Sequence, residues 1–352
     1  MIRTLALALC LALLLPAGPG RAQEYDMNIV TGGASGTYIQ IGKDIAAIAA
    51  ECGVTLKVNE SAGSIENVMA VRDRPRTQLG IAQSDVLEYV RTFQSEDPVL
   101  ARAAKGIRIV FPLYDEEIHV LAKKEITDLQ GLNGKKVSTG VEGSGNSLTA
   151  SLLLDLLKVQ PAERVKLNPA DSLAALLKGD IDAFFYVVGA PAALFSKGDI
   201  DGQRFHLLPL KESVLQELYT PTKIAAGTYP FQQEPVDVVA VKAVLLTYDW
   251  TPKRNAYQAS ACRTVADFSY LILSRLDQLR EKGHPKWKAV DLTALPPGWT
   301  VSSCVLDGIA PGYSFSCHKP DGTVVAEGAK PAAQTPEANQ IYVQRVCARI
   351  GC

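Results

Sequence analysis

The chain has 352 residues, of which 36 are lysine or arginine and 37 are aspartate or glutamate, and its net charge is −1. This balance leaves no excess of positive charge that would attract nucleic acid or an anionic membrane, so we expect neither as a partner. The length allows two lobes with cores of their own.

The first 22 residues have the pattern of a secretory signal peptide. Arg3 precedes an apolar run over residues 5–15, and Pro16 and several small residues lead to Ala22, after which we expect cleavage. The apolar run is too short to span a membrane, and retention as an N-terminal anchor is the alternative. Cleavage would remove two arginines and no acidic residue, which changes the formal charge to −3. We therefore expect an exported, periplasmic protein.

A glycine-rich turn over residues 31–38 follows the short predicted strand 27–30 and begins an amphipathic helix. The start of a helix leaves several N–H groups unpaired, and the helix dipole favours negative charge there. The glycines allow a ligand to approach the backbone closely. This turn is therefore a candidate anion site.

Strands and helices alternate through the rest of the first half. The predicted elements are a strand over 55–59, a helix after 61–64, a strand over 79–82 that ends at 83–85, and strands over 107–114 and 118–122. The alternation favours an α/β fold with a mainly parallel sheet, in which ligands gather at the carboxyl ends of the strands. Three polar turns, 31–38, 61–67 and 83–85, occupy that position.

A second α/β unit begins near Ile126. It contains a second glycine-rich turn, 140–147, and the pair of turns indicates one ligand held from two sides. The other elements expected are helices over 147–157 and 173–177, a buried strand over 181–188, a long strand over 236–246 that returns the chain to the first unit, and a helix over 268–279.

Residues 296–352 differ in composition from the rest, being rich in proline, glycine, serine and cysteine, and we expect a small stapled appendage there. An even number of cysteines in an exported chain predicts disulfides. Local spacing favours Cys304–Cys317 and Cys347–Cys352, which leaves Cys52 to pair with Cys262. Such a bridge over a long loop would contribute about 2–4 kcal/mol. Free or intermolecular thiols are the alternative.

Six stretches resemble, in order, the TAXI group of TRAP transporter solute-binding proteins, and together they cover most of residues 25–290. They are TGGASGTYIQIG (31–42), ESAGSIENV (60–68), LGIAQSDV (79–86), LNGKKVSTGVEGSGN (132–146), LLKGDIDAFFYVVGAP (176–191) and AAGTYP (225–230).

The resemblance implies a two-lobed, type II periplasmic-binding-protein-like fold with a ligand cleft between the lobes. It implies hinge closure on a small polar solute, such as glutamate or a related carboxylate, and delivery to the integral-membrane TRAP subunits. The chain would cross between lobes near 118–122 and 234–240. The expected parts are a signal peptide (1–22), lobe I (23–120 and 236–295), lobe II (121–235) and a cysteine-rich extension (296–352) outside the resemblance. We expect a monomer with no cofactor and no metal.

The resemblance and the turns together give the candidate ligand-binding residues. In the first lobe these are Gly33, Ala34, Ser35, Gly36, Thr37, Tyr38, Ser61, Gly63, Ser64, Asn67, Gln83 and Ser84; in the second they are Gly143, Ser144, Gly145, Asn146, Tyr186, Gly189 and Tyr229. The structural alternative is that the glycine turns only connect strand to helix and that the Ser and Asn residues cap helices.

Two features complicate an anionic ligand. Glu142 places a carboxylate within the second glycine turn, and none of the candidate turns contains an arginine, the natural bidentate partner of a carboxylate. Backbone N–H groups and hydroxyls would then carry recognition.

An enzyme is the less favoured interpretation. The four histidines, His119, His206, His284 and His318, show no metal-binding spacing, and neither glycine turn has the G-x-S-x-G pattern of a nucleophile elbow. A receptor that reports to a membrane signalling partner is the second hypothesis, and neighbouring permease or histidine kinase genes would discriminate between transport and sensing.

Overall fold

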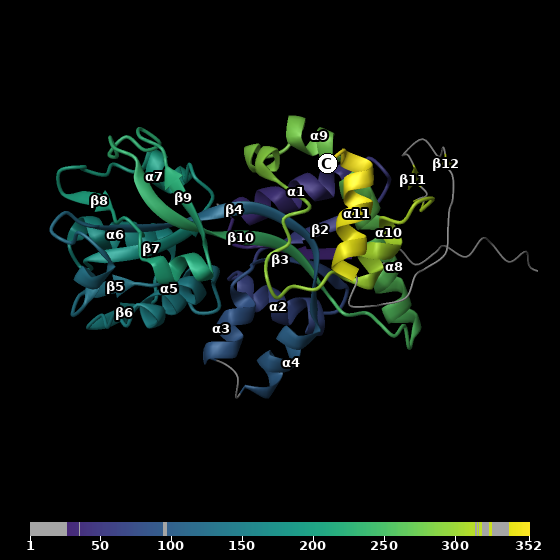
Figure 1. Ribbon diagram of the computed structural model, residues 1–352, viewed down its shortest axis with the longest axis horizontal. Helices are drawn as coiled ribbons and strands as arrows, with labels where there is room; N and C mark the ends of the chain where they lie inside the picture. Colours follow the sequence, from purple (N-terminus) through teal and green to yellow (C-terminus); the bar gives the residue numbers. More distant parts are fainter. Residues whose placement is uncertain are drawn as a thin grey trace, which may run out of the picture.

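The computed structural model describes residues 27–34, 36–93, 97–313, 315, 317–318, 324–325 and 338–352. The predicted signal peptide and the candidate Ser35 lie outside the described residues. Two α/β lobes lie side by side, and two long strands, β4 (Ile107–Lys123) and β10 (Val236–Tyr248), run from one into the other (Figure 1).

One mixed sheet extends through both lobes in the order β2-β1-β3-β10-β4-β7-β5-β6. At one end, β1 (Met27–Val30) pairs in parallel with β2 (Leu56–Asn59) and β3 (Thr77–Gln83). At the other end, β5 (Lys136–Ser138) pairs in parallel with β6 (Glu163–Val165) and β7 (Ala183–Val188).

The centre of the sheet is antiparallel, which corrects the expectation of a mainly parallel sheet. Strands β4 and β10 run in opposite directions through both lobes, so each pairs antiparallel with the other and with its remaining neighbours. Two short strands, β8 (Phe205–Leu207) and β9 (Thr220–Ile224), extend this central part. The strands predicted separately over 107–114 and 118–122 are one strand, because β4 continues across the lobe boundary.

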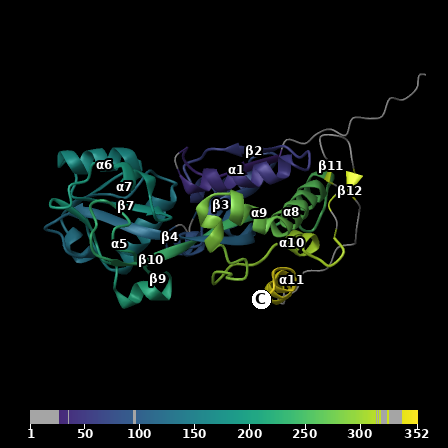
Figure 2. The same cartoon turned by 90° about the horizontal axis from the view of Figure 1, so that it is seen from above.

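Helices cover the sheet in both lobes (Figure 2). The first lobe carries α1 (Thr37–Ala50), α2 (Ser64–Asp73), α3 (Val86–Phe93), α4 (Pro98–Gly106), α8 (Ala256–Ser274), α9 (Leu276–Lys282), α10 (Ser303–Gly308) and α11 (Ala338–Ile350); the second carries α5 (Gly145–Leu156), α6 (Pro169–Lys178) and α7 (Ala193–Lys197). Three 3₁₀ turns, η1 (Leu129–Leu132), η2 (Ser213–Glu217) and η3 (Pro285–Ala289), and a small hairpin, β11 (Cys317–His318) with β12 (Val324–Val325), complete the described elements. The helix predicted over 268–279 is divided between α8 and α9.

Each lobe has its own hydrophobic core. The first core draws on residues between Ile29 and Tyr114 and between Ala243 and Val346, and the second on residues between Ile118 and Val241. The core therefore changes within a few residues on both long strands. Leu148 and Leu152 of α5 are the exception, because they lie in the second lobe but pack into the first core.

The described part of residues 296–352 belongs to the first lobe, which corrects the expectation of a separate appendage. Trp299, Val301, Tyr342 and Val346 are buried in the first core. The Tyr342 hydroxyl donates to the Leu292 carbonyl oxygen at 2.5 Å. The apolar positions of this segment therefore complete a core rather than stabilise an independent unit, and α10 and α11 lie against the first lobe in Figure 2.

The disulfide pairing also differs in part from the prediction. Cys347–Cys352 is confirmed, but Cys262 pairs with Cys304, with 5.2 Å between the Cα atoms. Helix α10 packs so closely on α8 that a Cβ on Gly308 would lie 2.0 Å from the Ala266 carbonyl oxygen. This packing places Cys304 beside Cys262, so both the Cys304–Cys317 and the Cys52–Cys262 predictions are wrong. Cys52 is also disulfide-bonded.

Among the described residues, no helix is both long enough and apolar enough to cross a membrane.

Candidate functional site

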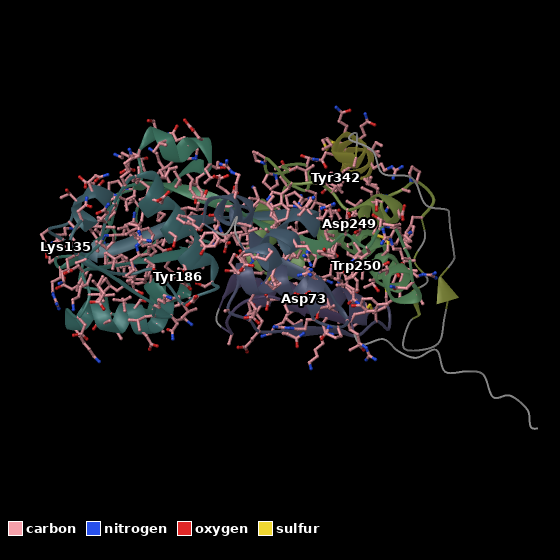
Figure 3. All side chains as sticks on the ribbon, turned by 90° about the horizontal axis from the view of Figure 1, so that it is seen from below. Asp73, Lys135, Tyr186, Asp249, Trp250 and Tyr342 are labelled. Carbon is pink, nitrogen blue, oxygen red and sulfur yellow. A yellow bond between two sulfur atoms is a disulfide. The ribbon has the colours of Figure 1, made fainter. Side chains whose placement is uncertain are left out.

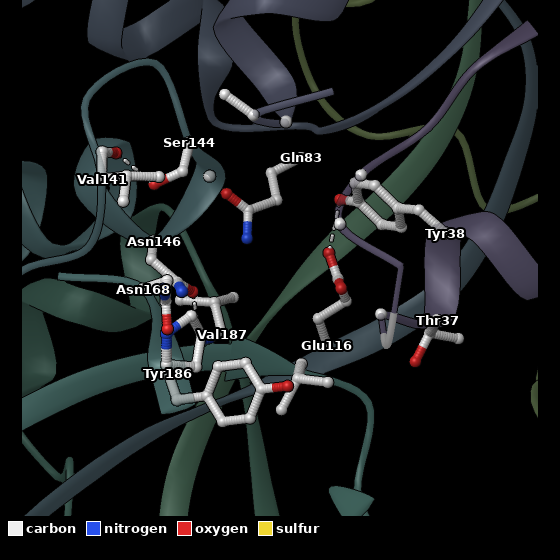
Figure 4. A pocket seen from close by; sticks show the side chains of 18 of the residues that line it. Thr37, Tyr38, Gln83, Glu116, Val141, Ser144, Asn146, Asn168, Tyr186 and Val187 are labelled. Carbon is white, nitrogen blue, oxygen red and sulfur yellow. Dashed lines mark hydrogen bonds between the residues drawn. The ribbon is translucent and has the colours of Figure 1, made fainter. Parts of the chain in front are cut away.

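A cavity of about 220 Å³ lies between the two lobes. Both lobes contribute to its walls, as Figure 4 shows for the side chains around it. The lining residues from the first lobe and the crossing strand are Gly32, Gly33, Gly36, Thr37, Tyr38, Ser61, Ala62, Gly63, Gln83 and Glu116; those from the second lobe are Val141, Ser144, Gly145, Asn146, Asn168, Pro169, Tyr186, Val187 and Val188.

The first glycine turn forms one wall. Gly36 is the residue that precedes α1, in extended backbone, and as a glycine it has no side chain with which to cap the helix. Its N–H donates to the Gly33 carbonyl oxygen at 2.9 Å, which closes the turn. Thr37 and Tyr38 follow in the first turn of α1 and line the cavity, whereas Ala34 is exposed and outside the lining. The uncapped start of α1 therefore faces the cavity.

Some residues of the 61–67 turn line the cavity, and others are buried and support the turn. Ser61 and Gly63 line the cavity. Asn67 is buried beneath them, where its amide nitrogen donates to the carbonyl oxygens of Thr31 (2.5 Å) and Ile81 (2.7 Å). Ser64 is also buried, and its hydroxyl accepts from the Gln83 N–H at 3.0 Å. Asn67 and Ser64 thus hold the turns together and are not exposed to the cavity.

The 83–85 turn is divided in a similar way. Gln83 lines the cavity, but Ser84 does not. The Ser84 backbone is fully engaged, since its N–H donates to the Lys242 carbonyl oxygen (2.8 Å) and its carbonyl oxygen accepts from the Trp299 indole N–H (2.9 Å). The C-terminal segment thereby supports this turn from behind.

The second glycine turn forms the opposite wall. Ser144 caps α5 by accepting from the Ser147 N–H at 3.1 Å, and Gly145 and Asn146 continue the lining. The Asn146 side-chain oxygen accepts from the Val187 N–H at 2.8 Å, which ties this wall to β7. Gly143 is not part of the lining. Its carbonyl oxygen instead accepts a hydrogen bond from the Ile65 N–H of the first lobe at 3.2 Å.

Tyr186 on β7 lines the cavity, but two other candidates from the second lobe do not. A Cβ on Gly189 would lie 2.3 Å from the Lys286 Cε, so this glycine makes room for a lysine. Tyr229 is fully buried, with its hydroxyl 2.7 Å from the His119 Nε2 and accepting from the Ala192 N–H at 3.0 Å. The structure places both residues in the framework of the second lobe.

Glu142 does not contribute a charge to the cavity. Its side chain is 83% exposed and pairs with the Lys166 ammonium at 2.8 Å, and this hydrogen bond lowers the pKa of the carboxyl. Its position in the glycine turn is therefore compatible with an anionic ligand.

The sequence prediction missed Glu116, a carboxyl that lines the cavity and is only 3% exposed. Its Oε2 accepts from the Tyr38 hydroxyl at 2.6 Å, and Figure 4 shows this pair beside Gln83 and Tyr186. Burial raises the pKa of Glu116 to about 8, and the Tyr38 hydrogen bond opposes the rise. The signal was available, since three consecutive acids interrupt an otherwise apolar strand at residues 115–117. Asn168 and Pro169, at the start of α6, are further lining residues that carried no recognisable motif.

A second buried carboxyl, Asp85, lies behind the cavity at the contact between the lobes. Its Oδ2 accepts from the hydroxyls of Thr149 (2.8 Å) and Tyr219 (3.0 Å), both from the second lobe. Burial raises the pKa of Asp85 to about 7, and these two hydrogen bonds oppose the rise. Asp85 therefore connects the lobes directly.

The chemical groups that line the cavity are mostly uncharged. They are hydroxyls, amides, glycine backbone, apolar side chains and one carboxyl, and the described lining residues include no lysine, arginine or histidine. Within the described ranges, no group of three or more His, Cys, Asp or Glu side chains could hold a metal ion.

Comparison with known proteins gives one family. The NMT1-like family matches residues 29–261, more than half of the chain. No curated protein matches the chain. Similar solved structures include one described as a periplasmic transporter (15% identity, TM-score 0.47, 93% of this chain and 97% of that one), MatC from Rhodopseudomonas palustris with bound malate (20%, 0.43, 75% and 94%), and the periplasmic binding protein BugD (11%, 0.43, 70% and 85%).

Proposed function

The chain belongs to the NMT1-like family, and we propose that it is an exported receptor that captures a small polar solute between its two lobes. The observation that carries this proposal is the cavity itself. Its polar walls come from the first turn of α1, the 61–63 and 83 positions, the start of α5 and the end of β7, so a solute inside it would touch both lobes. A volume of about 220 Å³ suits a small molecule.

Closure of the lobes on the solute follows from the same contacts. The two lobes meet through the Ile65 N–H with the Gly143 carbonyl oxygen and through Asp85 with Thr149 and Tyr219. A ligand that binds only when both walls are together favours this closed arrangement over an open one. We propose that the first lobe is residues 23–120 with 236–295, completed by the described part of 296–352, and that the second is 121–235. Bending would then occur where β4 and β10 pass between them.

We propose a carboxylate as one part of the solute, as in glutamate or a related organic acid. The residue at the start of α1, Gly36, has no side chain to cap the helix N–H groups, and the start of α5 lies across the cavity from it. Helix starts bind anions without a full positive charge. The outward orientation of Glu142 and its pairing with Lys166 support this part of the proposal.

The ordered TAXI-like stretches support delivery of the solute to the integral-membrane subunits of a TRAP transporter in the periplasm. Permease genes beside the coding sequence would support this partnership, and a histidine kinase gene in their place would favour a sensing receptor.

Binding without turnover is the direct test. Thermal shift and calorimetry with L-glutamate, L-glutamine, 2-oxoglutarate and succinate should give saturable binding by at least one solute, with a rise in melting temperature that follows RT ln(1 + [L]/Kd). Mass spectrometry of the purified protein should find that solute unchanged after incubation. If no member of the panel shifts melting or gives heat, and no small molecule co-purifies, the proposed receptor function is wrong.

A further inference from the structure

Three consecutive acids, Asp115, Glu116 and Glu117, lie on β4 where it passes between the lobes. The outer two each have a lysine partner. The Lys242 ammonium lies 2.6 Å from the Asp115 Oδ1, and the Lys286 ammonium lies 3.2 Å from the Glu117 Oε2. Side chains alternate between the two faces of a strand, so the middle acid points away from both of these pairs.

Glu116 has no such partner among the described residues. It lines the cavity, and its Oε2 accepts a hydrogen bond from the Tyr38 hydroxyl. The Lys286 ammonium acts on it electrostatically, but that ammonium is already held by Glu117 and by the Asp115 carbonyl oxygen at 3.1 Å. The other carboxyls that act on it, Glu117 and Asp85, add negative potential.

A buried carboxyl without a cationic partner is costly, because burial removes its hydration. The cost is removed when a ligand supplies the positive charge. The cavity has the space for such a group, and none of its described lining residues is a lysine, arginine or histidine that would compete for Glu116. The Tyr186 ring, which lines the cavity and faces Glu116 in Figure 4, adds a surface that is compatible with a cation.

We propose that Glu116 binds a protonated nitrogen of the solute, so that the receptor selects small molecules that carry a primary amine or an amidine. Tyr38 holds Oε2 in place and leaves Oε1 for the solute. Together with the helix starts this selects a zwitterion over a plain dicarboxylate. The inference rests on the proposed receptor function and names the chemical group of the solute, a protonated nitrogen, that the receptor recognises.

Matched pairs of solutes test the inference. Calorimetry would compare L-glutamate with glutarate, L-aspartate with succinate, L-alanine with propionate, and 1,4-diaminobutane with 1-butanol. We expect the binding members to be amines, with the corresponding compound that lacks the amine at least about tenfold weaker.

The matched variants are Glu116→Gln and Glu142→Gln. Each removes one carboxylate without changing side-chain size, but only Glu116 faces the cavity. Glu116→Gln should weaken the amine about 10- to 100-fold, the range for a hydrogen bond to a charged group, while Glu142→Gln should leave affinity unchanged. Circular dichroism and melting would verify that both variants fold.

The inference also predicts how binding depends on pH. The titratable groups that interact electrostatically with Glu116 are Tyr38 on α1, Tyr114 and Glu117 on β4, Tyr186 on β7, Asp85 after β3 and Lys286 on η3. Because an empty cavity favours the protonated carboxyl, amine binding should release a proton to solvent and tighten as pH rises from 6 to 9. The Glu116→Gln variant should lose this dependence.

The outcomes separate the two proposals. Binding of the compounds without amines as tightly as their partners, or undiminished amine affinity in Glu116→Gln, would overturn the inference and leave the receptor function standing. Binding by no member of either series would overturn the receptor function, and the inference with it.

Discussion

Glu116 and Asp85 are two carboxyls of nearly equal burial, 3% and 2% exposed, in two different parts of the lobe contact. Asp85 accepts hydrogen bonds from two hydroxyls of the opposite lobe and is enclosed between the lobes. Glu116 accepts a hydrogen bond from one hydroxyl of its own lobe and faces the cavity. The difference shows that one buried acid joins the two lobes through hydroxyls of the protein, whereas the other faces the cavity, where an occupant can contact it.

The largest effect is expected from a bulky side chain in either glycine turn, because such a side chain would fill the space between the two walls of the cavity. A Cβ on Gly145 would lie 2.2 Å from the Gln83 Oε1, so Gly145→Leu should abolish solute binding and leave a folded protein. Gly36→Leu should have the same result, since its Cβ would press on the Gly33 carbonyl oxygen at 3.3 Å. Calorimetry and melting would measure both. Unchanged affinity in both variants would remove the glycine turns from the site.

Removal of the enclosed acid should weaken binding indirectly. Asp85→Ala removes the acceptor of the Tyr219 hydroxyl in the closed arrangement and leaves Thr149 with only the Gln83 Oε1, at a cost of about 1–3 kcal/mol, which corresponds to roughly a 5- to 150-fold higher Kd. Small-angle scattering should show a larger radius of gyration for this variant at a given solute concentration. The control is Glu88→Ala, which removes an acid of α3 that pairs with Arg91. An unaltered radius and affinity in Asp85→Ala would contradict a role for this contact in closure.

The dependence of melting temperature on pH should distinguish Glu116 from an exposed acid. Burial raises the pKa of Glu116 from its ordinary value of 4.5 to about 8 in the folded protein. Between these two values the folded state binds more protons than the unfolded state, so stability falls as pH rises. Glu116→Gln should therefore gain melting temperature relative to the wild type as pH rises from 5 to 8.5. Glu142→Gln should show no such gain, because the pKa of Glu142 is lowered.

The smallest effect is expected from Tyr38→Phe. Its hydroxyl donates to Glu116 and opposes the rise in the pKa of that carboxyl, so the variant should bind an amine about 2- to 10-fold more weakly and require a higher pH for the same affinity. Calorimetry at pH 7 and pH 9 would measure this shift. Equal affinities for variant and wild type at both pH values would show that Tyr38 does not position Glu116.

Much of the fold could be predicted from short local patterns. The β1 strand, the glycine turn after it and the start of α1 were located within one or two residues, because apolar runs and glycine signals are local. The antiparallel centre of the sheet could not be predicted in this way. Strands β4 and β10 are mostly apolar on both sides of the lobe boundary, and nothing in such a run says that it continues from one lobe into the other.

The site was predicted least well where a side chain's direction decides its role. Asn67, Ser64 and Tyr229 lie in the expected segments, but their polar atoms meet buried backbone or His119 rather than the cavity. Glu116 was missed because it lies inside a strand and not in one of the polar turns that the sequence marks. Three adjacent acids are unusual in such a strand. The pairing of Cys262 with Cys304 depends on the packing of α10 on α8, which spacing alone does not encode.

The way the chain divides between the two cores has a consequence for biosynthesis. The second core is built mainly from one continuous stretch between Ile118 and Val241, so its contacts can form as soon as that stretch has been made. The first core unites residues near the N-terminus with Tyr342 and Val346 near the C-terminus. Its early strands therefore keep apolar surface uncovered until the C-terminal segment is also available for folding. The segment that completes the first core thus also ends the period in which the folding chain is prone to aggregate.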